Sequence, residues 1–322
     1  MTNVIAFAIL SAIKIGIVIG VLLLVIAYLI WIERKVMAHM QVRLGPMRVG
    51  WHGLLQPIAD GLKLILKEDI IPANASKILF VLSPAIAMVP ALLAIAVIPF
   101  GDTISIMGVS IDMVITDVNI GILFILAVSS VGVYGILLAG WSSNNKYSLL
   151  GGLRSSAQMI SYELSMGLSL IGVIMMTESL SLVDTVNAQA NLWFVVLQPV
   201  AFVVYAISAI AETNRCPFDL PEAETELVSG FHTEYSSMKF ALFFMAEYAN
   251  IITVSAVGVT FFLGGWRGPF LPPVVWFLIK MAMCIFFFVW LRSTFPRFRI
   301  DQLMKFAWKV LLPVAVVNVL IT

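Results

Sequence analysis

Charged residues are scarce in this chain of 322 residues: Asp, Glu, Lys and Arg make up 11% of it, and hydrophobic residues 61%. The mean hydropathy is +1.03. So little polar surface cannot cover the exterior of a protein folded in water, which excludes a soluble globular protein. The net charge of +1 argues neither for nor against nucleic-acid binding. The sequence has no basic patch with interleaved aromatic residues, so we expect no nucleic-acid partner.

Cysteine and histidine are also rare. The two cysteines, Cys216 and Cys284, fall in a predicted loop and inside an apolar segment, so we expect no disulfide bond between them. The histidines His39, His52 and His232 are isolated from one another in predicted loops. This distribution argues against a haem held by two histidines between helices, and we expect no metal site.

Long apolar runs are what the chain has in abundance. A membrane-spanning helix needs about 20 predominantly apolar residues. Eight segments qualify: 4–32, 78–99, 118–140, 153–176, 193–212, 238–263, 273–292 and 304–322. They are too long and too continuous for membrane strands, so the sequence predicts an all-α polytopic membrane protein, with 1–322 as a single membrane domain. The first run is also too long for the apolar part of a cleaved signal peptide.

The basic residues of the loops predict the orientation in the membrane. Loop lysines and arginines fall on one side of the predicted spans, and Arg267 is the exception. By the positive-inside rule that side is cytoplasmic, so both termini are expected on the periplasmic side. The acidic loop 213–236 is then cytoplasmic.

Residues 53–69, between the first two predicted spans, have a helical pattern. The apolar positions that follow it are Leu54, Leu55, Ile58, Leu62 and Ile65, with Asp60, Lys63 and Lys67 mostly elsewhere around the helix. The pattern predicts a short amphipathic helix at the membrane surface or against a partner. By itself it favours an ordinary interfacial helix over a specialised one.

Carboxylates are concentrated between residues 212 and 234, with Arg215 as the fixed positive charge. They are Glu212, Asp219, Glu222, Glu224, Glu226 and Glu234. At that density beside a bilayer they repel one another and face a desolvation cost, which raises carboxylate pKa values. Groups of this kind are candidates for taking up and releasing protons.

Two further glutamates lie inside predicted spans. A charged carboxylate near the middle of a span, as at Glu163, costs about 2.5–3.5 kcal/mol on insertion scales. Glu247 lies within the sixth span, and Glu212 closes the fifth. We expect a proton path in which Glu212 is shallow, Glu247 deeper and Glu163 deepest; the alternative for Glu163 is a satisfied hydrogen bond between helices.

Other charges near span ends leave two interpretations open. Glu33 and Arg34 directly follow the first span, and their spacing favours an interfacial anchor over the mouth of a pocket. Lys280, inside the seventh span, is equally compatible with a side chain that reaches the outer interface and with a functional role.

Several ordered motifs then change those interpretations together. They are WIERK (31–35), RLGPMRVG (43–50), GLLQPIADGLKL (53–64), GWSSNNKYSLLGGLRSSAQMISYE (140–163) and ETNRCPFDLPEAETELVSGFHTEYS (212–236). Over essentially the whole chain the sequence resembles the family known as the H subunit in bacterial NADH–quinone oxidoreductase and as ND1 in mitochondrial complex I. The family usually has Asn where this chain has Met47, which affects the fine geometry of that loop.

The resemblance implies a non-redox heel subunit of the membrane arm, with no catalytic residue or cofactor of its own. Quinone is the implied substrate, while FMN and iron–sulfur clusters belong to partner subunits. The implied partners are the peripheral-arm subunits of the quinone module and small membrane-arm subunits. Five consecutive spans are implied to resemble half of an antiporter-like channel. The SSNNKY form of the loop before the fourth span favours a bacterial inner membrane over a mitochondrial one.

The resemblance also implies roles for individual residues. Those expected at the quinone chamber are Glu33, Arg34, Asp60, Asp219, Glu222, Glu224, Glu226 and Glu234. Those expected to couple quinone chemistry to proton translocation are Glu163, Glu212 and Glu247.

Two alternatives remain. One is the homologous heel of a membrane-bound hydrogenase or of a complex linked to F420 or ferredoxin, which a gene neighbourhood without a flavin NADH-oxidising subunit would favour. The other is a stand-alone secondary transporter, against which no internal repeat and no span with paired Gly and Pro at its middle is visible.

Overall fold

The computed structural model describes residues 2–106, 109–111, 113–219 and 224–322. The described chain is helical apart from one antiparallel hairpin of β1 (Ile104–Ile106) and β2 (Val109–Ile111), in which Ile104 lies opposite Ile111. The predicted all-α polytopic class is therefore confirmed.

Among the described residues, seven helices are long and apolar enough to cross a membrane. They are α1 (Thr2–Met40), α3 (Lys77–Ala94, continued by the 3-10 turn η2, Ile95–Val97), α4 (Gly121–Ser142), α5 (Lys146–Thr177), α10 (Ser237–Phe262), α11 (Pro273–Thr294), and α12 (Ile300–Phe306), which runs through the π-helical turn η4 (Ala307–Leu311) into α13 (Leu312–Ile321). The first helix extends past the predicted end of its span, so His39 lies in its last turn and not in a loop.

The segment predicted as one span over 193–212 is divided in two. It forms α7 (Phe194–Leu197) and α8 (Pro199–Glu212), with the backbone of Gln198 between them at φ −127° and ψ 55°. Pro199 has no N–H and suits the first position of a new helix. The side-chain amide of Gln198 accepts a hydrogen bond from Asn318 at 2.8 Å and donates one to Thr322 at 2.7 Å, so both of its ends have partners.

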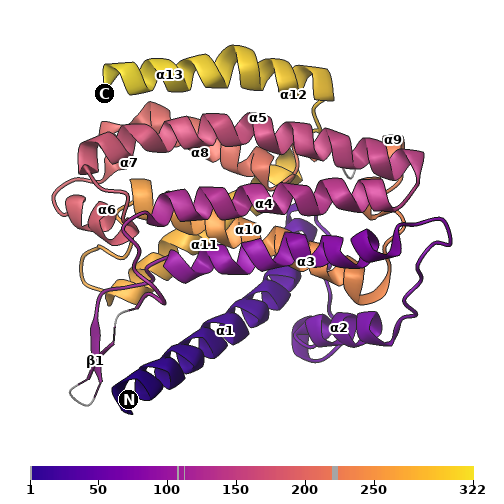
Figure 1. The fold of residues 1–322 in the computed structure, drawn as a ribbon, viewed down its shortest axis with the longest axis horizontal. Helices are drawn as coiled ribbons and strands as arrows, with labels where there is room; N and C mark the ends of the chain where they lie inside the picture. Colours follow the sequence, from indigo (N-terminus) through magenta and orange to yellow (C-terminus); the bar gives the residue numbers. More distant parts are fainter. Residues whose placement is uncertain (1, 107–108, 112, 220–223) are drawn as a thin grey trace.

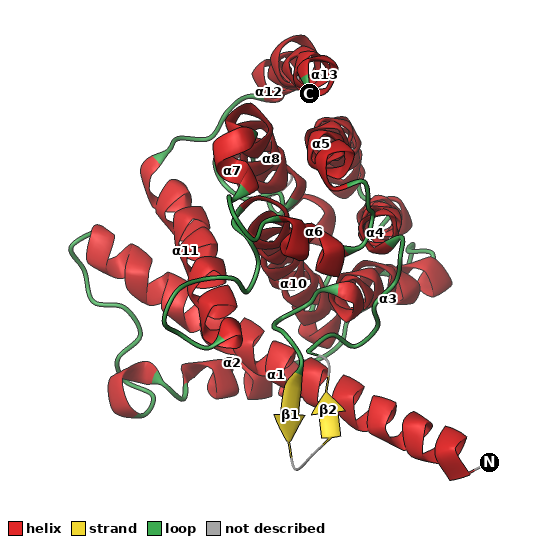
Figure 2. Cartoon of the chain, turned by 90° about the vertical axis from the view of Figure 1, so that its left-hand side faces the viewer, coloured by secondary structure: helices red, strands yellow, loops and turns green. Residues whose placement is uncertain are grey.

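Five of these helices close into a ring, seen end-on in Figure 2: α3 packs on α4, α4 on α5, α5 on α8, α8 on α10, and α10 on α3. Small residues allow the close approach. A Cβ on Gly135 of α4 would lie 2.6 Å from the backbone nitrogen of Ala87, and one on Gly140 would lie 2.7 Å from the carbonyl oxygen of Ser148.

The remaining long helices lie outside this ring. The oblique α1 packs on α10, α11 and the short helix α2 (Gln56–Leu66), which is the predicted amphipathic helix. Figure 1 shows both termini at one end of the bundle, with α6 (Leu182–Ala188), and α2 with α9 (Glu224–Leu227) at the other end. The described part of the acidic loop that includes α9 therefore lies at the end opposite the termini.

Candidate functional site

The acidic loop, residues 213–236, is fastened to the ring. Gln158 of α5, only 1% exposed, donates from Nε2 to the carbonyl oxygens of Ala211 and Phe218, both at 2.8 Å. Further along, the hydroxyl of Ser148 donates to the carbonyl oxygen of Phe231 at 3.1 Å, within the 3-10 turn η3 (Gly230–His232). Buried polar side chains of α5 thus position the loop at both ends.

The end of the loop is docked on α3 where that helix lacks a hydrogen bond. Pro84 has no N–H, so it cannot donate to the carbonyl of Phe80 one turn earlier. The hydroxyl of Tyr235 donates to that carbonyl at 3.2 Å, and its ring stacks on Phe80 with centroids 4.0 Å apart. Burial raises the pKa of Tyr235, so the phenol keeps the proton that it donates.

A buried ion cluster lies where the loop meets α1 and α10. Arg215, 6% exposed, places Nη1 3.1 Å from Oε1 of Glu33 on α1, while its Nε pairs with the carboxylate of Glu247 on α10. The ring of Tyr248 lies 4.4 Å from the guanidinium carbon, and its hydroxyl donates to Oε2 of Glu33 at 2.7 Å. A single arginine of the loop thus links two helices through their glutamates.

Arg292 of α11 completes this cluster by pairing with Glu33. We call Glu33, Arg215, Glu247, Tyr248 and Arg292 the Arg215 cluster. Burial lowers the pKa of Arg215, but Glu247, Tyr248 and Glu33 together raise it above its usual range, so the guanidinium stays charged. Buried charges persist when they are paired in this way.

The burial of Glu33 corrects the interpretation drawn from spacing. Glu33 is 4% exposed, so it is no interfacial anchor. Arg34 turns away from the cluster and pairs with Oδ2 of Asp60 on α2 at 2.7 Å, its side chain 47% exposed. The amide of Gln56 donates to the other oxygen of Asp60 at 3.0 Å. Glu33 and Arg34 are neighbours in the sequence, but Glu33 belongs to buried ion pairs and Arg34 to a pair at the surface.

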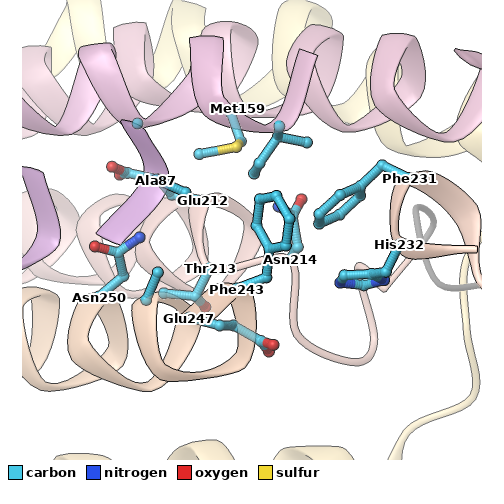
Figure 3. Close-up of a pocket in the computed structure, with 13 residues that line it drawn as sticks. Ala87, Met159, Glu212, Thr213, Asn214, Phe231, His232, Phe243, Glu247 and Asn250 are labelled. Carbon is cyan, nitrogen blue, oxygen red and sulfur yellow. The ribbon is translucent and has the colours of Figure 1, made fainter. Parts of the chain in front are cut away.

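Beside the Arg215 cluster lies a pocket of about 50 Å³, enough for a few water molecules. It is lined by both Glu212 and Glu247, and we call it the carboxylate pocket. Figure 3 shows Glu212 and Asn250 on one side of it and Phe231 and His232 on the other. Burial lowers the pKa of His232 to about 4, so this imidazole is neutral at pH 7.

A second cavity, of about 20 Å³, continues into the ring. Glu212 and Asn250 line both cavities, and Ser129 and Tyr205 also line the second one. Glu212 is 8% exposed, and its Oε2 has no hydrogen-bond partner among the described residues. The carboxylate of Glu212 therefore stands between two small cavities with acceptor capacity to spare.

Glu163, on α5, is the third carboxylate expected to take part in the coupling. It accepts a hydrogen bond from Ser130 of α4 and is close enough to Glu212 to act on it electrostatically. Arg215 thus pairs with Glu247, Glu247 and Glu212 line one pocket, and Glu163 acts electrostatically on Glu212. Of these carboxylates, Glu247 is the one that pairs with the loop arginine.

The other loop acids are dispersed in separate pairs. These pairs are Asp219 with Arg297 at 3.2 Å, Glu226 with Arg154 at 2.7 Å, and Glu234 with Asn145 at 2.7 Å. Asp219 is buried, whereas the Glu226 side chain is 56% exposed. Glu222 lies outside the described residues, as does the side chain of Glu224. Within the described part of this chain, these acids do not meet in one cavity.

Three contributors were not found by sequence reasoning: Tyr248, Arg292 and Asn250. Tyr248 follows Glu247 directly, and Asn250 lies one helical turn beyond it, so polar residues at that spacing in an apolar span were a usable signal. Arg292, in the last turn of α11, looks like an ordinary basic residue at a span end. Its contact with Glu33, 259 residues away, has no local signature.

The open interpretation of Lys280 is settled by its contacts. The side chain is buried and donates to the carbonyl oxygens of Leu263, Gly265 and Arg267 at 2.6, 3.0 and 2.6 Å. It therefore fastens the turn between α10 and α11, at the end of these helices that the sequence predicts to be outer. Both cysteines, Cys216 and Cys284, are free.

The chain is similar to known proteins over nearly its whole length. Residues 13–322 match the model of the family described as NADH dehydrogenase. An H subunit of NADH–quinone oxidoreductase from Geobacter sulfurreducens is 59% identical, over 96% of this chain and 92% of that protein. A second from Geobacter metallireducens is 58% identical, over 98% and 95%, and a third from Rhizobium meliloti is 51% identical, over 96% and 95%. With its seven apolar helices, this chain belongs to the family of the H subunits of bacterial NADH–quinone oxidoreductase, multi-pass proteins of the inner membrane.

Proposed function

We propose that this chain forms part of the quinone-binding chamber of a proton-pumping NADH–quinone oxidoreductase and couples quinone reduction to proton translocation. The observation that carries the proposal is the placement of Arg215 between Glu33 and Glu247. Glu33 is a quinone-side residue by family resemblance, and Glu247 lines the carboxylate pocket. The guanidinium of Arg215 thus links a residue proposed to lie near quinone with one proposed to take part in proton translocation.

The coupling follows from charge. Electrons added to a quinone near Glu33 create negative charge that must be compensated. A shift of Arg215 toward that charge weakens its pair with Glu247, which then binds a proton more readily. Glu212 lines the same pocket as Glu247, and Glu163 acts electrostatically on Glu212, so the three carboxylates titrate as a set and not with separate pKa values.

The other quinone-side residues are assigned by the same reasoning. Arg34 and Asp60, paired between α1 and α2, belong to the chamber entrance. The loop acids, which are Asp219, Glu222, Glu224, Glu226 and Glu234, belong to the chamber wall once the partner subunits cover the loop. We propose no catalytic residue or redox centre in this chain; FMN and iron–sulfur clusters are assigned to the peripheral-arm partners.

The orientation is part of the proposal. The basic loops gather at the end of the bundle that holds α2 and the acidic loop, and the termini lie at the other end. The positive-inside rule supports a cytoplasmic loop and periplasmic termini. A cytoplasmic acidic loop is where the peripheral arm has to dock.

The test of the coupling role uses Glu163→Gln and Glu247→Gln in the assembled complex. Both variants are expected to lower the number of protons translocated per NADH oxidised, measured in inverted membrane vesicles. Glu178→Gln is the matched control, because Glu178 is exposed at the C-terminal end of α5, away from the carboxylate pocket. Normal stoichiometry in both variants would remove the proton path.

The quinone role has a separate readout. Glu33→Ala and Arg34→Ala are expected to lower NADH–quinone activity more than NADH oxidation by an artificial acceptor, which bypasses the chamber. Equal loss of the two activities would instead indicate failed assembly. A complex that contains this chain but does not oxidise NADH would favour the hydrogenase-type or ferredoxin-linked relative.

A further inference from the structure

An apolar groove is lined by residues of α8, α10, α11 and α12. Its volume is about 900 Å³, near the upper end of the roughly 300–1,000 Å³ typical of sites that hold a whole organic ligand. Phenylalanine dominates the walls, with Phe202 from α8, Phe287 from α11 and Phe306 from α12. We call it the phenylalanine groove. It is separate from the carboxylate pocket, with which it shares no lining residue.

The groove has the length of one leaflet. Its lining on α11 runs from Met283 to Leu291, about 12 Å at 1.5 Å per residue, and continues past the helix end through Phe295 and Phe298. Half of a hydrocarbon core of about 30 Å is about 15 Å. The wall that α11 contributes therefore has about the depth of one layer of acyl chains, while Leu263 extends the lining toward the other end of α10.

The walls suit a flexible chain better than another helix. Membrane helices associate through small residues that let backbones approach. Here the small residue Gly258 is covered, because a Cβ on it would lie 3.0 Å from the ring of Tyr205. The hydroxyl of Tyr205 is already used by the carbonyl oxygen of Val254, at 2.6 Å. What remains is an irregular aromatic surface that methylene chains can follow.

The end of the groove carries positive charge. Arg297, Arg299 and Lys305 are exposed and adjacent in sequence to the lining residues Phe298 and Phe306. Arg299 is 80% exposed, and its pair with Asp301, at 3.5 Å on the surface, contributes little. Arg297 forms an ion pair with Asp219. Basic groups near the membrane surface attract anionic lipid head groups. A neutral quinone head group does not have this attraction.

We propose that the phenylalanine groove binds one anionic phospholipid of the phosphatidylglycerol class, with its acyl chains along the groove and its phosphate beside Arg299. The lipid would fill the space behind Phe288, which also lines the small cavity at Glu33 and Arg292. A bound lipid therefore supports the wall of the Arg215 cluster without taking part in it. This inference does not depend on the proposed function.

Native mass spectrometry of the assembled complex tests the proposal. The complex is stripped of lipid in detergent and then titrated with phosphatidylglycerol or phosphatidylcholine. One phosphatidylglycerol is expected to bind more tightly than phosphatidylcholine. Met283→Trp, which narrows the groove, is expected to remove that binding, whereas Phe286→Trp, at an exposed position of α11 outside the groove, is expected to retain it.

The head-group contact has its own pair of variants. Arg299→Gln is expected to weaken phosphatidylglycerol binding roughly five-fold, because a basic residue near the membrane surface contributes about 1 kcal/mol. Arg299→Lys, which keeps the charge, is expected to bind as the unchanged chain does. Three results would overturn the proposal: equal binding of the two lipids, full binding by Met283→Trp, or recovery of quinone instead of phospholipid from the groove.

Discussion

Replacing Arg215 by Gln tests whether the Arg215 cluster is a stabilising link or an accidental contact. Arg215 is buried, and the substitution removes the ion pairs that it makes with Glu33 and Glu247. Glu33 keeps its pair with Arg292, and Glu247 loses its pair with the Arg215 guanidinium. Removing one partner of a buried pair costs about 3–5 kcal/mol, because the other charge is left in a poorly solvated site.

A surface pair of the same chemistry gives the scale. Arg154 and Glu226 lie 2.7 Å apart with side chains 28% and 56% exposed, and such a pair contributes about 0–1 kcal/mol. Arg215→Gln should therefore destabilise the chain by several times as much as Arg154→Gln. The assay is the temperature at which the assembled complex loses this chain on native gels, with quinone activity recorded in parallel.

The double variant Arg215→Gln with Glu247→Gln sharpens the test. In the double variant the side chain at 247 no longer carries the charge that paired with Arg215, so the double variant should be more stable than Arg215→Gln alone. Equal effects of Arg215→Gln and Arg154→Gln, or strictly additive losses in the double variant, would refute the reasoning.

Two further variants probe the docking of the acidic loop. Burial lowers the pKa of His232 to about 4 in the fold, so between pH 6.5 and 4 the unfolded chain binds a proton that the folded chain does not. The free energy of unfolding should decrease as the pH is lowered from 6.5 to 4, by up to about 3 kcal/mol at about 1.36 kcal/mol per unit. His232→Gln should make the melting temperature less dependent on pH, and an unchanged dependence would contradict this. A Cβ on Gly151 would lie 2.7 Å from Cα of Gly230, so Gly151→Ala should lower the melting temperature, a loss of about 1–3 kcal/mol. Gly167→Ala, which meets no atom within 4 Å, should be neutral or stabilising, and equal losses at the two glycines would contradict the close packing.

The helical class could be predicted because a membrane span is a long apolar run in the sequence. The division at Gln198 could not, because a proline near the start of a span is compatible with one continuous helix. The helix α5 also begins before the predicted span 153–176. Residues 146–152 are polar enough to resemble a loop, and they are helical where Ser148 and Gly151 pack against the segment around Phe231.

The site was predicted as a set of residues but not as an arrangement. Intramembrane glutamates such as Glu163 and Glu247 stand out because charge is costly there. Their partners do not stand out: Arg215 and Glu33 meet across 182 residues, and no local spacing reports that contact. Nothing in the sequence indicates that Glu33 and Arg34 face different surroundings, since both follow the same apolar run.

Pro84 and Tyr235 illustrate a constraint that acts between distant positions. The proline leaves the carbonyl of Phe80 without its helical donor, and the tyrosine hydroxyl uses it. A residue with an N–H at position 84 would close the bond within α3 and compete with Tyr235 for the same oxygen. Positions 84 and 235 should therefore co-vary among related sequences, with loss of the proline accompanied by loss of the tyrosine hydroxyl.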